Sequence, residues 1–166
     1  ISLSVALIGA FSAFFIGLAY GVVAGFYGGR IDNVMMRIVD VLYAFPSLLF
    51  IILLMVTFKT GFGSVQDNSF FRTVGQIDAQ FGGMFLIIVG ISFTSWVPIA
   101  RLTRGMALAL RNSDFIQSAV ALGARDRRIV FRHLIPGLLA PLLVSVTLAI
   151  PQFIATEAFL SFIGIG

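Results

Sequence analysis

Apolar and charged positions alternate in long blocks along this chain, not with the short periods of a soluble helix or strand. Charged residues are absent from four intervals, 1–29, 41–58, 79–100 and 134–156. A helix needs about 20 apolar residues to cross the hydrocarbon core of a bilayer, and it satisfies its own backbone hydrogen bonds there. The pattern therefore predicts four transmembrane helices. Pro46 lies inside the shortest interval and removes a backbone donor, which predicts a kink.

The composition is typical of an integral membrane protein. Hydrophobic residues make up 59% of the 166 residues, charged residues only 11%, and the mean hydropathy is +1.06. Soluble proteins carry about 25% charged residues, so the predicted fold class is all-α, a polytopic transmembrane helix bundle with four spans. The formal net charge of +4 does not indicate nucleic-acid binding, because the basic residues flank apolar spans and do not cover a soluble face.

The residue types and motifs that are missing narrow the chemistry. The chain has no Cys and one His, which excludes disulfides, thiolate ligands and cysteine nucleophiles and argues against a protein metal site. It contains no G-x-x-x-x-G-K-[ST], H-E-x-x-H or G-x-S-x-G motif, so we expect no enzymatic activity and no cofactor, ATP included. The chain starts at Ile1 without a Met and ends within an apolar stretch, and we interpret it as a fragment.

The distribution of basic residues predicts an orientation. If the second and fourth spans run outward, nine arginines lie on the cytoplasmic side and only Lys59 and Arg72 lie outside, which is a clear positive-inside bias. The nine are Arg30, Arg37, Arg101, Arg104, Arg111, Arg125, Arg127, Arg128 and Arg132. Residues 59–80 then form an external loop, and Ile1 begins outside, so we expect a further span before it.

Small residues recur every four positions along the first span. They are Gly9, Ala13, Gly17, Gly21 and Gly25. Such a ridge lets two membrane helices approach until their backbones touch. We interpret it as helix packing within the chain in preference to a subunit interface.

The segment 111–137 is a basic loop between two apolar runs. Asp114 predicts a helix N-cap with Gln117 at the third position, an aspartate version of the capping box, and Gly123 predicts a left-handed helix end. The predicted helix is Phe115–Leu122, with an apolar stripe of Phe115, Ile116, Ala119 and Leu122. A second helical stretch, capped by Asp126, is predicted to carry Arg125, Arg127, Arg128 and Arg132.

An apolar stripe with basic flanks has two interpretations. It suits a helix that docks in a groove of a partner protein. It equally suits a helix that lies on anionic lipid, with the arginines following the orientation rule. The residues alone leave both alternatives open.

Three ionisable residues near the spans are interpreted separately. Asp40 follows Arg37 by three residues, which predicts an ion pair within one helix. His133 is interpreted as structural and not as a pH sensor. Glu157 stands in an apolar stretch, where a carboxylate is costly without a partner or water, so lining a pathway and bonding within the bundle are its two alternatives.

Residues 117–136 resemble the EAA loop of ABC importer permeases, whose pattern is Glu-Ala-Ala, three residues, Gly, nine residues and Ile-x-Leu-Pro. The positions of this pattern are occupied by Gln117, Ser118, Ala119, Gly123, His133, Ile135 and Pro136. Gln replaces Glu, Ser replaces the first Ala and His replaces Ile, so a role that needs the loop's carboxylate is not carried over. The spacing is unchanged.

The resemblance covers nearly the whole chain. AGFYGGRIDNVMMRIVDVLYAFPSLL, WVPIARLTRGMALALRNSDF, RRIVFRHLIPGLLAPLLV and EAFLSFIGIG are similar to the C-type subunit of the dipeptide, oligopeptide and nickel branch of these permeases. This implies a partial ABC transporter transmembrane domain over 1–166, holding the second to fifth of about six helices. The loop 111–137 would couple to the ATPase, and Glu157 would lie near the outer gate. The implied coupling residues are Asp114, Phe115, Gln117, Ser118, Ala119, Leu122, Gly123, Arg125, Arg127, Arg128 and Pro136.

The resemblance also implies a function and a set of partners. The function is ATP-driven import of peptides or nickel across a bacterial or archaeal cytoplasmic membrane. The implied partners are a second permease subunit, two ATP-binding subunits that bind the ATP, and an external solute-binding protein.

Two other functional classes are weighed against this one. An ion-coupled secondary transporter would use Asp40 and Glu157, but it is expected to show broken helices in matched halves around midplane charges, and the four predicted spans carry their acids near the ends. A non-transporting membrane scaffold is the second alternative. An ATPase gene beside the coding sequence would separate the importer from both.

Overall fold

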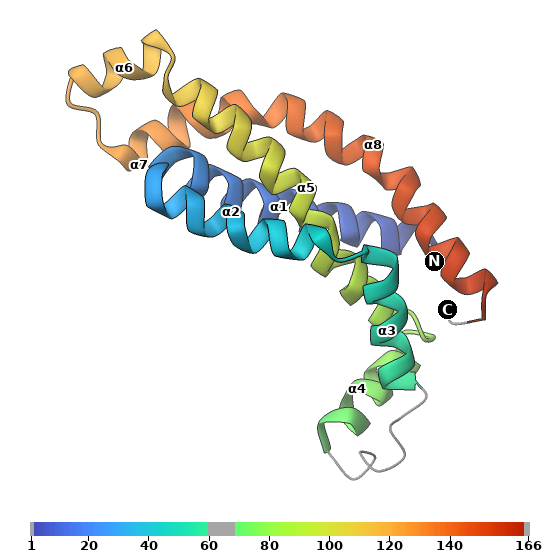
Figure 1. Cartoon of the computed structure of the whole chain (residues 1–166). Helices are drawn as coiled ribbons and strands as arrows, with labels where there is room; N and C mark the ends of the chain where they lie inside the picture. Colours follow the sequence, from blue (N-terminus) through green and yellow to red (C-terminus); the bar gives the residue numbers. More distant parts are fainter. Residues whose placement is uncertain (1, 60–68, 165–166) are drawn as a thin grey trace.

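The structure is a computed structural model that describes residues 2–59 and 69–164, and every regular element within those ranges is a helix. The long helices are α1 (Ser2–Tyr27), α5 (Phe85–Arg111) and α8 (Ile135–Phe162). The shorter ones are α2 (Gly29–Ala44), α3 (Ser47–Lys59), α4 (Ser69–Gln80), α6 (Asp114–Ala121) and α7 (Asp126–Ile129), and a π-helical turn, η1 (Val130–Leu134), joins α7 to α8. Helices α1, α5 and α8 pack together, and α6 and α7 project from the end of the bundle where α1 turns into α2 (Figure 1).

The arrangement confirms the predicted all-α polytopic bundle. Three helical stretches are long and apolar enough to cross a membrane, 2–27, 85–111 and 126–162, and residues 29–44 with 47–58 make a fourth if the bent pair is one span. The two halves of that pair meet at an angle of 72°. The predicted kink at Pro46 is therefore a full break, in which Phe45 adopts the extended backbone that a residue before proline prefers.

The helices of two predicted spans have other bounds than the charge-free intervals. Helix α5 runs over Phe85–Arg111 where the interval was 79–100, and the last helical stretch runs from Asp126 to Phe162 where the interval was 134–156. Charged residues thus stand within the helices, where the sequence pattern placed the span ends. A charge can be accommodated there when it finds a partner inside the protein or reaches the interface.

Ion pairs between α2 and α5 explain why α5 extends past its charged residues. Arg104 forms a two-point pair with the buried Asp32, with 2.8 Å between Nε and Oδ1. Arg101 pairs with Asp40 at 2.5 Å and lies over the ring of Tyr43, 4.2 Å from its centroid. The predicted pairing of Asp40 with a residue of its own helix was therefore wrong.

The ridge of small residues on α1 faces α5 of the same chain. A Cβ atom added to Gly21 would lie 2.6 Å from the carbonyl oxygen of Ala100 and 2.4 Å from the Cβ of Thr103. One added to Gly25 would lie 2.6 Å from the Cβ of Ala107. The two backbones touch along this seam, so packing between α1 and α5 holds the bundle where lipid supplies no hydrophobic drive.

The predicted external loop holds a helix that the sequence analysis missed. Residues 60–68 of that loop lie outside the described residues, and α4 follows them. The carboxylate of Asp78 in α4 accepts a hydrogen bond of 3.1 Å from the backbone N–H of Leu86. It thereby satisfies one of the free donors at the start of α5.

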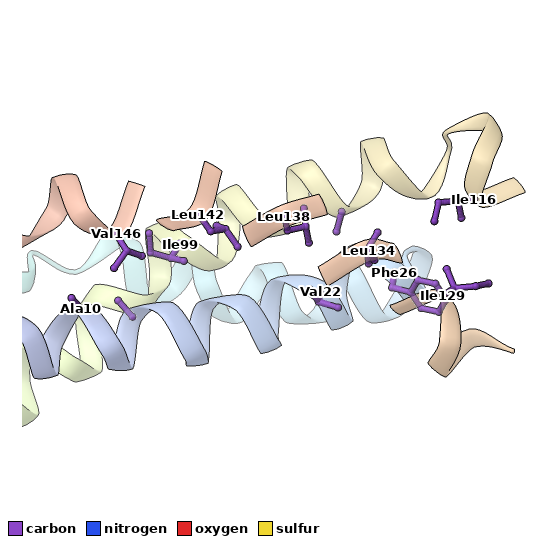
Figure 2. Packing of buried hydrophobic residues seen from close by; sticks show 12 residues of the cluster. Ala10, Val22, Phe26, Ile99, Ile116, Ile129, Leu134, Leu138, Leu142 and Val146 are labelled. Carbon is purple, nitrogen blue, oxygen red and sulfur yellow. The ribbon is translucent and has the colours of Figure 1, made fainter. Parts of the chain in front are cut away.

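A continuous apolar cluster joins the helices that project from the bundle to its core. Ile116 of α6 and Ile129 of α7 are each 1% exposed and lie at the same end of the cluster as Phe26 and Leu134 (Figure 2). The segment between α5 and α8 is therefore packed onto the bundle through both of its helices.

Candidate functional site

Residues 112–134 connect α5 to α8 through a bent pair of short helices, and we call this segment the elbow. Helix α6 begins directly after α5 ends, and α7 continues through η1 into α8. Six of the seven positions of the EAA pattern lie on helical segments, three in α6 and three around η1 and the start of α8. The seventh, Gly123, lies between α6 and α7.

The predicted capping residues were displaced by one position. Ser113 holds the N-cap position of α6 and Arg125 that of α7, so Asp114 and Asp126 are the first residues inside their helices. Neither residue makes a side-chain hydrogen bond that caps its helix, and the hydroxyl of Ser113 donates to Leu110 O. The capping box is therefore absent, although an aspartate in the first turn still favours the positive end of the helix dipole.

Gly123 ends α6 in the left-handed region that the sequence predicted. Its φ is +80°. Its N–H donates to Val120 O at 2.9 Å, and the N–H of Ala124 donates to Ala119 O at 3.0 Å. This is a Schellman motif, in which glycine avoids the Cβ strain of positive φ. It turns the chain from α6 into α7, and α6 itself ends at Ala121, one residue earlier than predicted.

The apolar stripe predicted on α6 divides between the core and the surface. Ile116 is buried, whereas Phe115 is 50% exposed and Leu122 is 89% exposed. Val120, at 56% exposed, also lies on the surface and was not predicted. The buried residue fixes α6 to the bundle, and the exposed ones are free to contact another molecule.

The remaining EAA positions lie where α7 passes into α8. Pro136 has no N–H to donate to the preceding turn, and its ring would crowd the carbonyl four residues earlier. The wider π turn accommodates it, with Ile135 N–H bonding to Val130 O across five residues. His133 lies in this turn, and its ring stands edge-on to Phe115, 6.3 Å between centroids. The π turn thus lets α7 and α8 form one continuous helix through a proline.

Glu157 lies inside α8, with its side chain buried. The residue is 3% exposed, and its Oε1 accepts a hydrogen bond of 3.0 Å from the hydroxyl of Ser161. Oε2 is the one fully buried side-chain nitrogen or oxygen without a hydrogen-bond partner in the described part of the chain. A buried carboxylate in a membrane span is costly, so this oxygen is a point where a further group would be accommodated.

An open cavity of about 860 Å³ lies beside the break in the second span. Its wall is formed by the break itself and by the middle parts of α5 and α8, and all of its lining residues are uncharged. Aromatic side chains alternate there with polar ones, among them Tyr43, Phe45, Phe50, Phe93, Thr94, Gln152 and Thr156. Of the lining residues, only Pro46 at the break was predicted to have a structural effect. The aromatic residues near that proline, Phe45 and Phe50, are the local signal in the sequence.

The fold and these sites define a class. The chain is a multi-span helical membrane protein with an exposed helical elbow at one end of the bundle and an uncharged cavity between its spans. Among the described residues, no cluster of three metal-ligating side chains occurs.

Comparison with known proteins gives the family. The pattern of the family described as "Binding-protein-dependent transport system inner membrane component" matches residues 17–166, and the chain belongs to this family. It is 39% identical over 166 residues to the dipeptide transport system permease protein DppC of Bacillus subtilis, and the aligned part is 100% of this chain and 45% of the relative. It is 39% identical over 151 residues to the oligopeptide transport system permease protein OppC of the same organism, covering 91% of this chain and 42% of the relative.

A third relative is named for a different substrate. The glutathione transport system permease protein GsiD of Pectobacterium atrosepticum is 33% identical over 166 residues, covering 100% of this chain and 48% of the relative. The chain thus spans less than half the length of these curated relatives.

Proposed function

We propose that this chain is part of a pore-forming permease subunit of an ATP-driven importer for peptides. The observation that carries the proposal is the family match over residues 17–166, joined to an elbow that presents exposed apolar side chains. The relatives are named for dipeptide, oligopeptide and glutathione transport, which favours a peptide over nickel. The proposed partners are a second permease subunit, two ATP-binding subunits and an external solute-binding protein.

Helix α6 supplies the proposed contact with an ATP-binding subunit. Leu122 and Phe115 are large, apolar and exposed, and few buried anchors carry most of the energy when a helix docks in a groove. Ile116 and the Schellman turn at Gly123 hold α6 in a fixed position. A motion of the ATP-binding subunits would then move α6 and the helix that follows it together.

The test is association of the ATP-binding subunits with variants of the full permease. Burial of a Leu side chain contributes about 2 kcal/mol, so Leu122→Ala is expected to lower the association constant about 30-fold. Phe115→Ala should act similarly. Leu148→Ala is the matched control, because Leu148 is 73% exposed but lies on α8 away from the elbow.

Arginine variants separate a groove contact from an electrostatic one. Arg125, Arg127 and Arg128 are all exposed, and an electrostatic contact would weaken with salt. We expect Gln substitutions at these three positions to retain the ATP-binding subunits at low and high salt. Retention by the Phe115 and Leu122 variants together with release by the arginine variants would contradict the role of α6.

We propose that the residues lining the cavity beside Pro46 form part of the wall of the translocation pathway. Irregular backbone at membrane depth is tolerated where it lines a cavity, and small-molecule sites combine apolar walls with a few polar groups. The hydroxyls of Thr94 and Thr156 donate to backbone carbonyls of their own helices, so their oxygens keep lone pairs to accept bonds from a peptide. Gln152 adds an amide to the same wall.

Thiol labelling tests this wall. Gln152→Cys should react with a membrane-impermeant thiol reagent in the assembled transporter, and peptide substrate should slow the reaction. Leu148→Cys, one helical turn away and outside the cavity lining, should not react under the same conditions. Equal labelling of both, or labelling that substrate leaves unchanged, would remove the cavity from the pathway.

A further inference from the structure

An apolar groove runs between α1 and the α7–α8 helix. It has a volume of about 540 Å³, and its lining includes Phe15, Leu18, Val22, Phe26, Val130 and Ile135. From Phe15 to Tyr27 the groove follows α1 over twelve residue-to-residue steps, about 18 Å at 1.5 Å per residue. One leaflet's share of the hydrocarbon core is about 15 Å. The groove therefore has the length of one acyl chain.

Basic side chains lie at one end of this groove. Arg127 lines both the groove and an adjoining open cavity of about 450 Å³, whose other lining residues are Arg125, Arg128 and Phe131. The guanidinium of Arg127 stands 6.0 Å from the ring centre of Phe131. Among the described residues none of the three arginines forms an ion pair, and Asp126 is the single acid in the lining of the two cavities. The groove end thus carries an excess of unpaired positive charge.

Tyr27 indicates that the basic end of the groove lies at the membrane interface. Tyr27 is the last residue of α1, is 55% exposed and also lines the groove. Tyrosine prefers the membrane interface, where its ring is apolar and its hydroxyl is wet. The apolar groove then follows the span toward the bilayer centre, and the arginines lie at the interface.

This combination selects an amphiphile with an anionic head. A transmembrane helix that covered the groove would have to bury the arginines against its own apolar end, which costs free energy without a partner charge. A phosphodiester headgroup accepts paired hydrogen bonds from guanidinium groups, and basic pockets between membrane helices hold such headgroups. We propose that the groove binds one anionic phospholipid, with an acyl chain along α1 and its phosphate held by Arg127 together with Arg125 and Arg128.

The test uses the full transporter in nanodiscs that contain phosphatidylglycerol and phosphatidylcholine in equal amounts. Native mass spectrometry after detergent release reports the lipid retained by the permease. The wild type should retain phosphatidylglycerol in preference to phosphatidylcholine. Arg127→Gln with Arg128→Gln should lower this preference by about fivefold for each arginine removed.

Two further variants identify the site. Ala19→Trp fills the groove from α1 and should reduce retention of both lipids. Arg30→Gln removes an exposed charge at the same end of the bundle, outside both cavities, and should retain lipid as the wild type does.

Several outcomes would overturn the proposal. Equal retention of the two lipids by the wild type would do so, and an Arg30→Gln effect as large as that at Arg127 would show only surface attraction. If Ala19→Trp left lipid retention intact and disrupted subunit assembly, a protein helix would be the occupant. Release of the ATP-binding subunits together with the lipid in the Arg127 and Arg128 variant would assign these arginines to the subunit contact.

Discussion

The close packing of α1 against α5 predicts that Gly21→Ala lowers the stability of the protein. In Gly21→Ala the new Cβ would lie 2.4 Å from the Cβ of Thr103 and 2.6 Å from Ala100 O, whereas carbon atoms in contact are about 3.5 to 4.0 Å apart. One of the close atoms belongs to the backbone, so the helices must separate by about 1 Å. Overpacking of this kind costs about 1 to 3 kcal/mol, against a helix-propensity gain of about 1 kcal/mol for Ala over Gly. We expect a net loss of up to about 2 kcal/mol.

Two other glycines of the same helices serve as controls. Gly105 lies in α5, and a Cβ there meets nothing within 4 Å, so Gly105→Ala should be neutral or stabilising. A Cβ at Gly9 meets the Cγ2 methyl of Ile91 at 2.8 Å, and a side chain can turn away more cheaply than a backbone. The expected order of stability is Gly105→Ala, then Gly9→Ala, then Gly21→Ala.

Reversible unfolding of the purified protein in mixed detergent and SDS measures these differences. The three variants share one chemical change, so differences in their free energy of unfolding report the space around each glycine. A Gly21→Ala protein as stable as Gly105→Ala would refute the close approach of α1 and α5.

Three further predictions follow from the elbow, the ion pairs and the orientation. Gly123→Val should impose about 1 to 3 kcal/mol of backbone strain and lower transport while membrane insertion persists. Gly123→Asn should retain more transport activity because Asn tolerates positive φ. Uptake at the wild-type rate in the Val variant would refute this role of Gly123. Asp32→Asn should destabilise the protein by less than the roughly 3–5 kcal/mol of a fully buried broken pair, because Arg104 is 36% exposed, and adding Arg104→Gln should recover part of the loss in a double-mutant cycle. In this cysteine-free chain, Asn112→Cys should be labelled only from the cytoplasmic side and Gln76→Cys only from outside, and the reverse pattern would reject the proposed orientation.

The existence of the spans could be predicted from the sequence, but their ends could not. Charge-free intervals locate helices because hydrocarbon excludes unpaired charge. Arg101 and Arg104 can lie within α5 because they form ion pairs with Asp40 and Asp32 of α2. Such pairs lie 61 and 72 residues apart in the chain, and nothing local in the sequence indicates them.

The elbow shows the same division between local and long-range information. Gly123 could be predicted because only a local backbone requirement, the positive φ, decides it. The burial of Ile116 could not, because it depends on Ile129 and Phe26 from other helices. The N-cap was misplaced by one residue because Ser113 and Asp114 are both good capping residues, and helix ends are the least certain part of such predictions.

The uninterrupted helix from Asp126 to Phe162 links the two ends of the bundle mechanically. Its 37 residues extend roughly 55 Å at 1.5 Å per residue, so a tilt of about 1° at one end displaces the other by about 1 Å. The residues beside the elbow, the wall of the cavity at Gln152 and the buried Glu157 all lie on this one helix. If α6 moves as proposed, the helix that continues α7 would carry the displacement toward the cavity wall and the buried carboxylate.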